Sequence, residues 1–217
     1  MTKIGVFDSG VGGQAVVDAI KRSIPDADVV YADDKANVPY GNKTPEELKQ
    51  LVLPILNMLS KQGCDAIVVA CNSVTTTIIS DLRQKISTPL IGMEPMVKPA
   101  AATTETGMIA VCATPATLKS TRYAWLKQQY ADGVEVLEPD CSAWPYMIES
   151  KQIDHNKIRS RIADVCEAGA DVIVLGCTHY HWIEKEIKDI AKEYKTTVIQ
   201  PEQPVIAQLK RVLGLRP

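Results

Sequence analysis

The segment GCDAIVVACN, residues 63–72, decides the fold because it recurs in the second half of the chain as GADVIVLGCT, residues 169–178. Each copy is a run of apolar, mostly β-branched residues that ends at a cysteine, Cys71 in the first and Cys177 in the second. Such a run, bounded by glycine and polar residues, is typical of a buried strand. The repeat predicts two similar units in one chain, each with a cysteine at the same strand end.

The same spacing extends outside the two segments. Apolar residues 4–7 begin 67 residues before Cys71, and residues 109–112 begin 68 residues before Cys177. Short apolar runs alternate with longer segments of helical period, which is the pattern of a parallel α/β protein. We expect strands at 3–8, 28–33, 65–70, 107–112, 134–137, 171–175 and 196–199. We expect helices to follow Gly12, Ser73, Pro115, Ser142, Asn156, Tyr180 and Pro204.

One helix start is especially clear. Thr44 fits an N-cap, Pro45 fits the first helical position, and Glu47 lies three residues after Thr44 as in a capping box. A helix is therefore predicted between the second and third strands.

The boundary between the two units falls near residues 93–102, where Pro95 and Pro99 interrupt the sequence. We expect an α/β fold of two similar parallel-sheet domains, residues 1–96 and 97–203, that face each other across a central cleft. Each domain holds roughly 100 residues, a common domain size. We expect the C-terminal helix, residues 204–217, to pack back on the first domain.

Composition narrows the classes of function. The chain has 217 residues, 24 Lys+Arg against 26 Asp+Glu, a formal net charge of −2 and 46% hydrophobic residues. This excludes a disordered or fibrous protein and gives no overall basic field for nucleic acid or anionic membranes. The N-terminus reaches Asp8 before a signal-peptide core could form, and no apolar run approaches the roughly 18 residues of a membrane helix. We expect a soluble, cytoplasmic protein with no nucleic-acid or membrane partner.

The two repeat cysteines have the position and pairing that catalysis would need. Active residues of parallel sheets gather beyond the carboxyl ends of the strands, where helix starts lower thiol pKa values and bind carboxylates. If the two units face each other, Cys71 and Cys177 approach one ligand from opposite sides. One thiolate can then remove an α-proton from one face of a carbon while the other thiol returns a proton to the opposite face. This arrangement indicates a two-base racemase or epimerase, although each cysteine taken alone would more often be a core residue.

Other polar residues lie at the same strand ends. Asp8 follows the first strand and either orients a substrate ammonium and assists proton transfer, or caps a helix. His179 is a candidate acid/base partner of Cys177. Glu149 is either a carboxylate that supports the site or an exposed helix residue. We expect Trp182 in the core, in a stripe of helical spacing with two isoleucines.

The histidines near Cys177 also allow a metal-site interpretation. The run from Cys177 to His181 contains one cysteine and two histidines. The sequence supplies no second cluster of soft ligands at a recognised spacing, so we expect no metal. The remaining cysteines form no C-x-x-C pair, and we expect them to be reduced, buried and structural.

Four motifs in order carry a family resemblance: DSGVGG at 8–13, PYG at 39–41, CNS at 71–73 and LGCTHY at 175–180. Together they resemble glutamate racemase, within the aspartate/glutamate racemase superfamily, over most of the chain. The resemblance implies a cofactor-independent homodimeric enzyme that interconverts L- and D-glutamate and supplies D-glutamate for peptidoglycan and cell-wall biogenesis. It implies that Cys71 and Cys177 transfer the protons, assisted by Asp8, His179 and Glu149. The substrate contacts that it implies are Ser9, Pro39, Tyr40, Gly41, Asn72, Ser73, Thr114, Thr117 and Thr178.

The chain departs from the family pattern at three places. Ser73-Val74 stands where Thr-Ala is usual, and His181-Trp182 replaces the usual Pro-Leu. The C-terminus is shorter than in typical members, and residues 200–203 differ from the usual sequence. These changes leave the cysteine pair intact and bear on substrate size, regulation and the dimer surface.

Three alternatives remain open. The pattern Gly10-x-Gly12-x-x-Ala15, with Asp33 or Asp34 in the ribose-binding position, fits an NAD(P)-binding reductase. Against it, a carboxylate before the glycine loop repels a pyrophosphate, and the cysteine repeat stays unexplained. A non-catalytic, two-lobed small-molecule binding protein is the second alternative. The third is an aspartate racemase or a related amino-acid isomerase.

Overall fold

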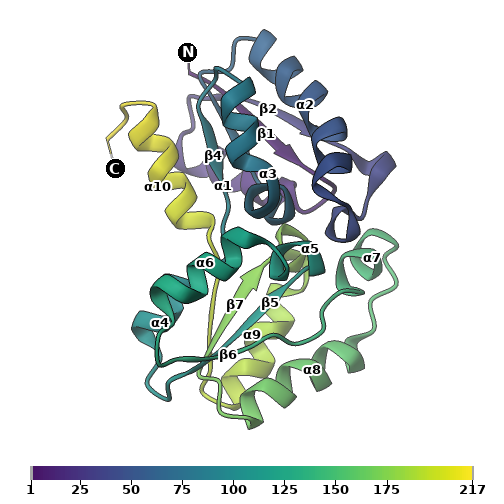
Figure 1. Cartoon of the computed structure of the whole chain (residues 1–217), viewed down its shortest axis with the longest axis vertical. Coiled ribbons are helices and arrows are strands. Elements are labelled where there is room, and N and C mark those ends of the chain that lie inside the picture. Colours follow the sequence, from purple (N-terminus) through teal and green to yellow (C-terminus); the bar gives the residue numbers. More distant parts are fainter. Residues whose placement is uncertain (1, 217) are drawn as a thin grey trace.

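Two four-stranded parallel sheets build the molecule (Figure 1). The computed structural model describes residues 2–216, so Met1 and Pro217, the outermost residues of the expected domains, lie outside the described residues. The first sheet has the order β2-β1-β3-β4 and the second the order β6-β5-β7-β8. Their strands are β1 Lys3–Asp8, β2 Asp28–Asp33, β3 Ala66–Val69, β4 Leu90–Gly92, β5 Met108–Ala113, β6 Glu135–Leu137, β7 Val172–Gly176 and β8 Thr197–Ile199.

The sequence repeat is also a repeat of strand register. Ile4 lies opposite Ala66, five residues before Cys71. Ile109 lies opposite Val172, likewise five residues before the second repeat cysteine. The predicted α/β class with two similar parallel sheets is therefore confirmed. Below, elements β1 to β4 are the first half, and elements α4 to β8 are the second half.

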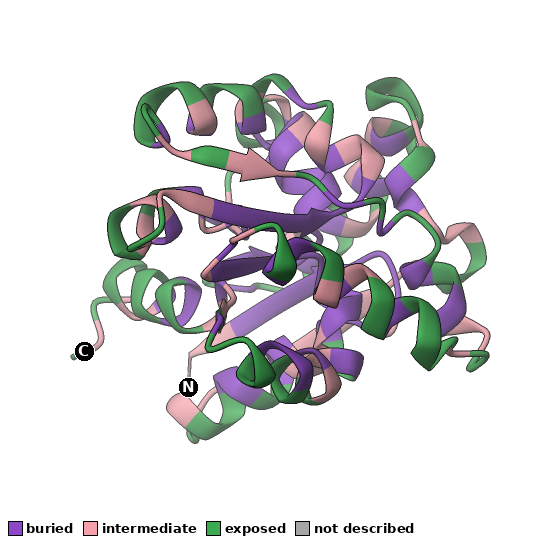
Figure 2. Cartoon of the chain, turned by 90° about the horizontal axis from the view of Figure 1, so that it is seen from below, coloured by how far each residue is buried: buried purple, intermediate pink, exposed green. Residues whose placement is uncertain are grey.

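Helices cover both faces of each sheet, so the central strands are buried between exposed helical surfaces (Figure 2). Strands β3 and β7 are buried at every position, as expected for parallel sheets with both faces covered. The α-helices are α1 Gly13–Ser23, α2 Pro45–Lys61, α3 Asn72–Lys85, α4 Val97–Thr103, α5 Pro115–Leu118, α6 Thr121–Tyr130, α7 Trp144–Glu149, α8 His155–Glu167, α9 Glu184–Glu193 and α10 Glu202–Val212. Three 3-10 helices are η1 Lys35–Asn37, η2 Tyr40–Asn42 and η3 Thr178–Ile183.

The predicted capping box of α2 is present. The Thr44 side chain accepts from the Glu47 amide, and the Glu47 carboxylate accepts from the Thr44 amide at 2.7 Å. Two backbone amides at the start of the helix, which have no acceptor within the helix, are hydrogen-bonded in this way. The cap fixes where the loop that contains Tyr40 joins α2.

The connection between the halves contains two elements that the sequence did not predict. Strand β4 has only three residues, and α4 begins inside the region expected as a change-over. Pro99 does not break α4 because it lies in the first turn, where the helix needs no amide from it. Helix α10 returns to the first half and buries Val205 and Leu209 in the same cluster as Ile4 of β1 (Figure 1).

The expectation that Trp182 belongs to the core is wrong. Ile183 and Ile187 are buried, but Trp182 is 58% exposed. Residues 178–183 form a 3-10 helix with three residues per turn, so Tyr180 and Ile183 share the inner face and Trp182 points outward.

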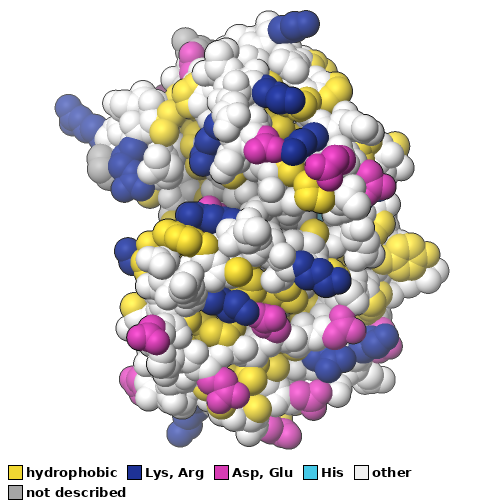
Figure 3. All heavy atoms as spheres, in the orientation of Figure 1, with side chains coloured by type: hydrophobic (Ala, Val, Ile, Leu, Met, Phe, Trp, Pro, Cys, Tyr) yellow, Lys and Arg dark blue, Asp and Glu magenta, His cyan; other side chains and the backbone are white. Residues whose placement is uncertain are grey.

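The surface and the remaining cysteines fit a globular α/β protein. On the face shown in Figure 3, Lys and Arg side chains are interspersed with Asp and Glu. Among residues 2–216, no helix is both long and apolar enough to cross a membrane. The cysteines outside the repeat ends, Cys64, Cys112, Cys141 and Cys166, are buried and free.

Candidate active site

One small cavity lies between the two halves, beyond the carboxyl ends of β1, β3, β5 and β7. Its volume is about 10 Å³, room for roughly one water molecule. Its walls come from both halves, which is the central cleft predicted from the repeat. The lining residues are Ser9, Pro39, Tyr40, Gly41, Cys71, Asn72, Ser73, Thr114, Pro145, Cys177, Thr178 and His179.

Three predicted site residues do not line this cavity: Asp8, Thr117 and Glu149. Each contacts a residue that does, as described below. Pro145 lines the cavity and was not predicted. It opens the short helix α7 outside every motif, so no sequence signal marks it.

The two repeat cysteines meet in this cavity, one from each half. Cys71 follows β3 and is the N-cap of α3, and Cys177 follows β7. Both are buried, with 5% and 8% of their surface exposed. The Cys71 thiol donates to the Ser9 hydroxyl at 3.6 Å, and the sulfur of Cys177 lies 3.7 Å from Nδ1 of His179. The arrangement offers two sulfur atoms to a single ligand.

Burial raises the pKa of Cys71 to about 12, and the charge of Asp8 acts in the same direction. The Val74 amide in the first turn of α3 lowers this pKa, as the sequence argument expects of a helix start. Its effect is smaller than the effect of removing water from the thiol. The expectation of a lowered thiol pKa is therefore wrong for Cys71 in the closed cleft.

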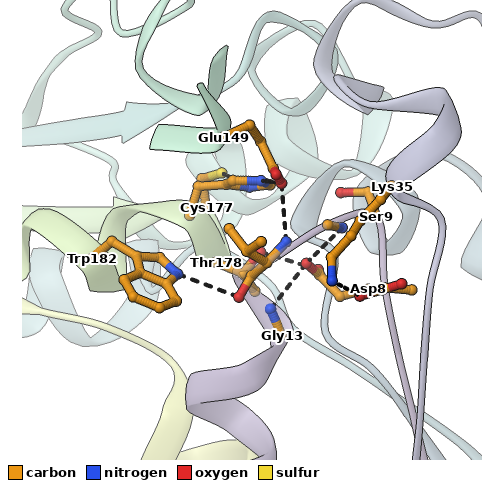
Figure 4. A network of polar contacts seen from close by, with 12 residues as sticks. Asp8, Ser9, Gly13, Lys35, Glu149, Cys177, Thr178 and Trp182 are labelled. Carbon is orange, nitrogen blue, oxygen red and sulfur yellow. Dashed lines mark hydrogen bonds and ion pairs between the residues drawn. The ribbon is translucent and has the colours of Figure 1, made fainter. Parts of the chain in front are cut away.

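His179 and Glu149 form a buried ion pair beside Cys177 (Figure 4). Nε2 of His179 lies 2.7 Å from Oε1 of Glu149. Burial lowers the pKa of His179, but the hydrogen bonds to Cys177 and Glu149 outweigh it and raise that pKa to about 10. The hydrogen bond to His179 in turn lowers the pKa of Glu149. The imidazole therefore lies between the Glu149 carboxylate and the Cys177 sulfur, and the carboxylate favours its protonated form.

Asp8 links the start of α1 to the second half (Figure 4). Its Oδ2 accepts from the amides of Gly10 at 3.1 Å and Gly13 at 3.0 Å, and its Oδ1 accepts from the Thr178 hydroxyl at 3.0 Å. Burial raises the pKa of Asp8, whereas the charge of His179 and these hydrogen bonds lower it. Asp8 therefore binds amides at the start of α1, as the capping interpretation expects, and it also holds a residue of the cavity wall. Its role in orienting a substrate or assisting proton transfer stays a prediction.

Hydroxyl groups form another part of the cavity wall. The Ser73 and Thr114 hydroxyls lie 2.8 Å apart and join the two halves. Thr114 also donates to the Thr117 hydroxyl at 3.2 Å, which places Thr117 behind the wall. The side-chain amide of Asn72 donates to the backbone carbonyl of Met93 at 2.9 Å.

The loop that contains Tyr40 closes the cavity with its ring and backbone. The Tyr40 hydroxyl donates its proton to Asp34 at 2.5 Å, so only its oxygen lone pairs remain for a ligand. A Cβ built on Gly41 would lie 2.8 Å from Cβ of Thr114, so this loop packs tightly against the second half.

The glycine loop after β1 packs closely against the second half. A Cβ on Gly10 would lie 2.0 Å from a Glu149 oxygen, and one on Gly12 would lie 2.5 Å from the Thr178 carbonyl carbon. The loop amides that would bind a pyrophosphate already donate to Asp8 and Glu149. This packing argues against the reductase alternative.

His181 takes no part in the cavity wall. Its Nδ1 lies 3.8 Å from Glu184, and burial lowers its pKa. Among residues 2–216, no group of three or more His, Cys, Asp or Glu side chains is arranged to hold a metal ion.

Comparison with known proteins identifies the family. The family described as Asp/Glu/Hydantoin racemase matches residues 7–209. A glutamate racemase from Pseudomonas entomophila (strain L48) is 38% identical over 98% of this chain and 82% of its own length. Escherichia coli glutamate racemase, solved with L-glutamate and the activator UDP-MurNAc-ala, superposes with a TM-score of 0.90 at 27% identity, over 98% of this chain and 82% of that one. Francisella tularensis glutamate racemase, solved with D-glutamate, gives a TM-score of 0.79 at 28% identity over the same shares of the two chains. The chain therefore belongs to the Asp/Glu/Hydantoin racemase family.

Proposed function

We propose that this chain is a glutamate racemase that interconverts L- and D-glutamate by proton transfer between two cysteines and the α-carbon. The observation that carries the proposal is the presence of Cys71 and Cys177, from opposite halves, in the wall of one cavity. The glutamate racemases that resemble this chain, two of them solved with a glutamate enantiomer, support the choice of substrate.

Each turnover exchanges one proton for another without any redox change. A thiolate on one face takes the α-proton, so the Cα–H bond breaks and its electron pair stays on the α-carbon. The opposite thiol then donates its proton to that carbon, so a new Cα–H bond forms with inverted configuration. The reverse reaction uses the same two groups with exchanged roles. No step requires a cofactor.

The surroundings of the two cysteines differ in a way that suits the first step. Burial raises the pKa of Cys71 to about 12, so we expect it to be the neutral thiol that donates. Nδ1 of His179 lies 3.7 Å from the Cys177 sulfur, close enough to take up or return the proton of that thiol. We therefore propose that Cys177 acts as the base when Cys71 is the acid, with the roles exchanged in the reverse direction.

We propose that the hydroxyls and amides of the cavity wall bind the amino acid. Ser73 and Thr114 join the halves by their hydroxyls, and Thr178 is held by Asp8. Hydroxyls and helix-start amides are good partners for a carboxylate. The other proposed substrate contacts are Ser9, Pro39, Tyr40, Gly41, Asn72 and, behind the wall, Thr117.

Three wider proposals follow from the family resemblance. The D-glutamate formed supplies peptidoglycan synthesis, the enzyme works in the cytoplasm, and it forms a homodimer. The first is tested by growth of a D-glutamate auxotroph that expresses this chain, and the last by sedimentation velocity. We also propose a domain division of 1–96 with 204–217, and 97–203, which the contact of α10 with the first-half core supports.

The decisive experiment supplies L-glutamate, D-glutamate, L-aspartate and D-aspartate separately to the purified protein in D₂O. Circular dichroism at a fixed wavelength and α-deuterium incorporation are recorded together, with no cofactor added. Loss of the signal together with exchange for glutamate alone supports the proposal. Exchange for aspartate alone would assign the aspartate racemase alternative. Binding without exchange for any of the four would favour a non-catalytic module.

A further inference from the structure

Trp182 is an exposed side chain that reaches across the cleft. It is 58% exposed, yet its indole Nε1 donates to the backbone oxygen of Val11 at 3.3 Å (Figure 4). Trp182 belongs to η3 of the second half, and Val11 belongs to the loop after β1 of the first half. Because Trp182 is exposed, packing in the core is not its role. Its hydrogen bond across the cleft points to a different one.

Val11 is held by the second half through both its backbone and its side chain. Its amide donates to Oε1 of Glu149 at 2.9 Å, and its carbonyl accepts from Trp182. Its side chain packs against the second-half cluster that includes Trp144 and Tyr180. In Figure 4, Glu149 and Trp182 approach the loop after Asp8 from two sides.

The contacts of Val11 continue to the thiol of Cys177. The Oε1 atom of Glu149 that accepts from Val11 also pairs with Nε2 of His179 at 2.7 Å. Nδ1 of the same imidazole lies 3.7 Å from the Cys177 sulfur. A displacement of Val11 therefore removes one of the contacts that fix the carboxylate, and the carboxylate orients the imidazole. Such supporting contacts determine how well a catalytic group is positioned.

We propose that Trp182 is a positioning residue for proton transfer at Cys177. Its indole N–H holds the Val11 loop against the second half when the cleft is closed, and the loop amide then fixes Glu149 and His179. Trp182 does not line the cavity. The inference rests on the proposed function and assigns a role to one of the positions at which the sequence departs from its family pattern.

Two substitutions separate the hydrogen bond from the bulk of the side chain. Trp182→Phe keeps an aromatic ring without the donor, and Trp182→Gln keeps an N–H donor without the ring. Trp125→Phe is the matched control, because Trp125 is also exposed, at 40%, and lies on α6. The readouts are amide hydrogen exchange of Val11 by NMR without substrate, kcat in both directions, and the primary isotope effects with α-deuterated L- and D-glutamate.

We expect Trp182→Phe to speed exchange of the Val11 amide and to lower kcat, each about two- to tenfold, the range that corresponds to one lost hydrogen bond. The two isotope effects should diverge. The isotope effect should grow for the enantiomer whose α-deuteron is removed by Cys177, because that step becomes slower. For the other enantiomer the isotope effect should shrink. Trp182→Gln should restore slow Val11 exchange and similar isotope effects, and Trp125→Phe should resemble the wild type.

Unchanged Val11 exchange in Trp182→Phe would overturn the proposal, because the contact would then not hold the loop. A fall in kcat with no divergence of the isotope effects would also overturn it, since a general loss of stability affects both directions alike. Racemisation by the wild-type protein distinguishes failure of this inference from failure of the proposed function. Wild-type racemisation with an unaffected Trp182→Phe variant rejects the positioning role alone, whereas absence of wild-type racemisation rejects the proposed function.

Discussion

At the scale of single residues, the proposed chemistry depends on two sulfur atoms in different surroundings. Replacing either Cys71 or Cys177 by serine keeps the size of the side chain but replaces the thiol by a far weaker acid. We expect each variant to lose at least about a hundredfold in kcat, the lower end of the contribution of a positioned acid or base. The measurement is circular dichroism with L- and D-glutamate, with far-UV spectra to confirm folding. Cys166→Ala, on α8 away from the cavity, is the control, and full activity of either serine variant would reject the two-base mechanism.

The ion pair between His179 and Glu149 makes a prediction about pH. The folded-state pKa of about 10 lies above the ordinary value of 6.5. The stabilisation from this pair is therefore complete below about pH 6.5 and is lost as pH rises through about 10. Glu149→Gln removes the charge of the carboxylate but keeps an acceptor for the Val11 amide. In this variant the midpoint of the His179 titration, followed by NMR, should therefore lie at a lower pH than in the wild type.

The same substitution should flatten the pH dependence of the free energy of unfolding. Urea denaturation gives the free energy of unfolding of the wild type and of Glu149→Gln at each pH. The difference between these two free energies should shrink as the pH rises from about 6.5 to 10. A His179 midpoint that is equal in both proteins would show that the carboxylate does not set the protonation of the imidazole.

At the scale of elements, the loop between β1 and α1 is built for close approach to η3. Gly12 has an ordinary helical φ of −64°, so any residue suits its backbone conformation. Its Cβ, however, would lie 2.5 Å from the Thr178 carbonyl carbon and 2.6 Å from the His179 nitrogen, both backbone atoms. The constraint on Gly12 is therefore space between the halves and not conformation.

Gly12→Ala should consequently damage activity more than stability. The added methyl group cannot be accommodated by a side-chain rotation, so it should push α1 away from η3 and the Cys177 loop. We expect kcat/KM to fall at least about tenfold, as is typical when catalytic groups are displaced by an ångström, with a small change in the urea midpoint. Gln14→Ala on the exposed face of α1 is the control. Equal kcat/KM for Gly12→Ala and wild type would show that the loop has more freedom than its contacts indicate.

The elements differ in how well the sequence alone predicts them. The buried strands and the α2 start were predicted because apolar runs and the Thr44–Glu47 pair are local signals. Strand β4 has three residues, too few for a period, and Pro99 concealed the start of α4. Trp182 was misplaced because an α-helical period was applied to a segment that forms a 3-10 helix.

At the scale of the whole molecule, two sets of contacts hold the cleft closed. One is the Ser73–Thr114 hydrogen bond, and the other is the contacts of Asp8 and Val11 with the second half. A volume of about 10 Å³ cannot admit an amino acid, which is several times larger than a water molecule. For the proposed reaction we therefore expect the cleft to open and close again in each turnover, a common gating motion.

The sequence predicted that two halves would meet at a cleft, but not how tightly. Matched strand ends place Cys71 and Cys177 at one edge of each sheet, and that information is local to each repeat. Closure depends on contacts such as that of Val11 with Glu149, whose partners are 138 residues apart. No pattern in a single sequence marks such a pair. The raised pKa of Cys71 was not expected either, since it arises from burial, which the position of a cysteine at a strand end does not reveal.

Cleft opening predicts a pattern of thiol reactivity. All six cysteines are buried and free, but only Cys71 and Cys177 lie between the halves. Separation of the halves should bring water and reagent to both thiols, and a thiol in contact with water forms the reactive thiolate more readily than a buried one. Peptide mapping after brief iodoacetamide treatment should find these two labelled at least about tenfold faster than Cys112 and Cys141, which only deeper unfolding exposes. Glutamate should slow the labelling of the cleft pair alone, and a common slow rate for all four would mean that the closed cleft opens only when the protein unfolds.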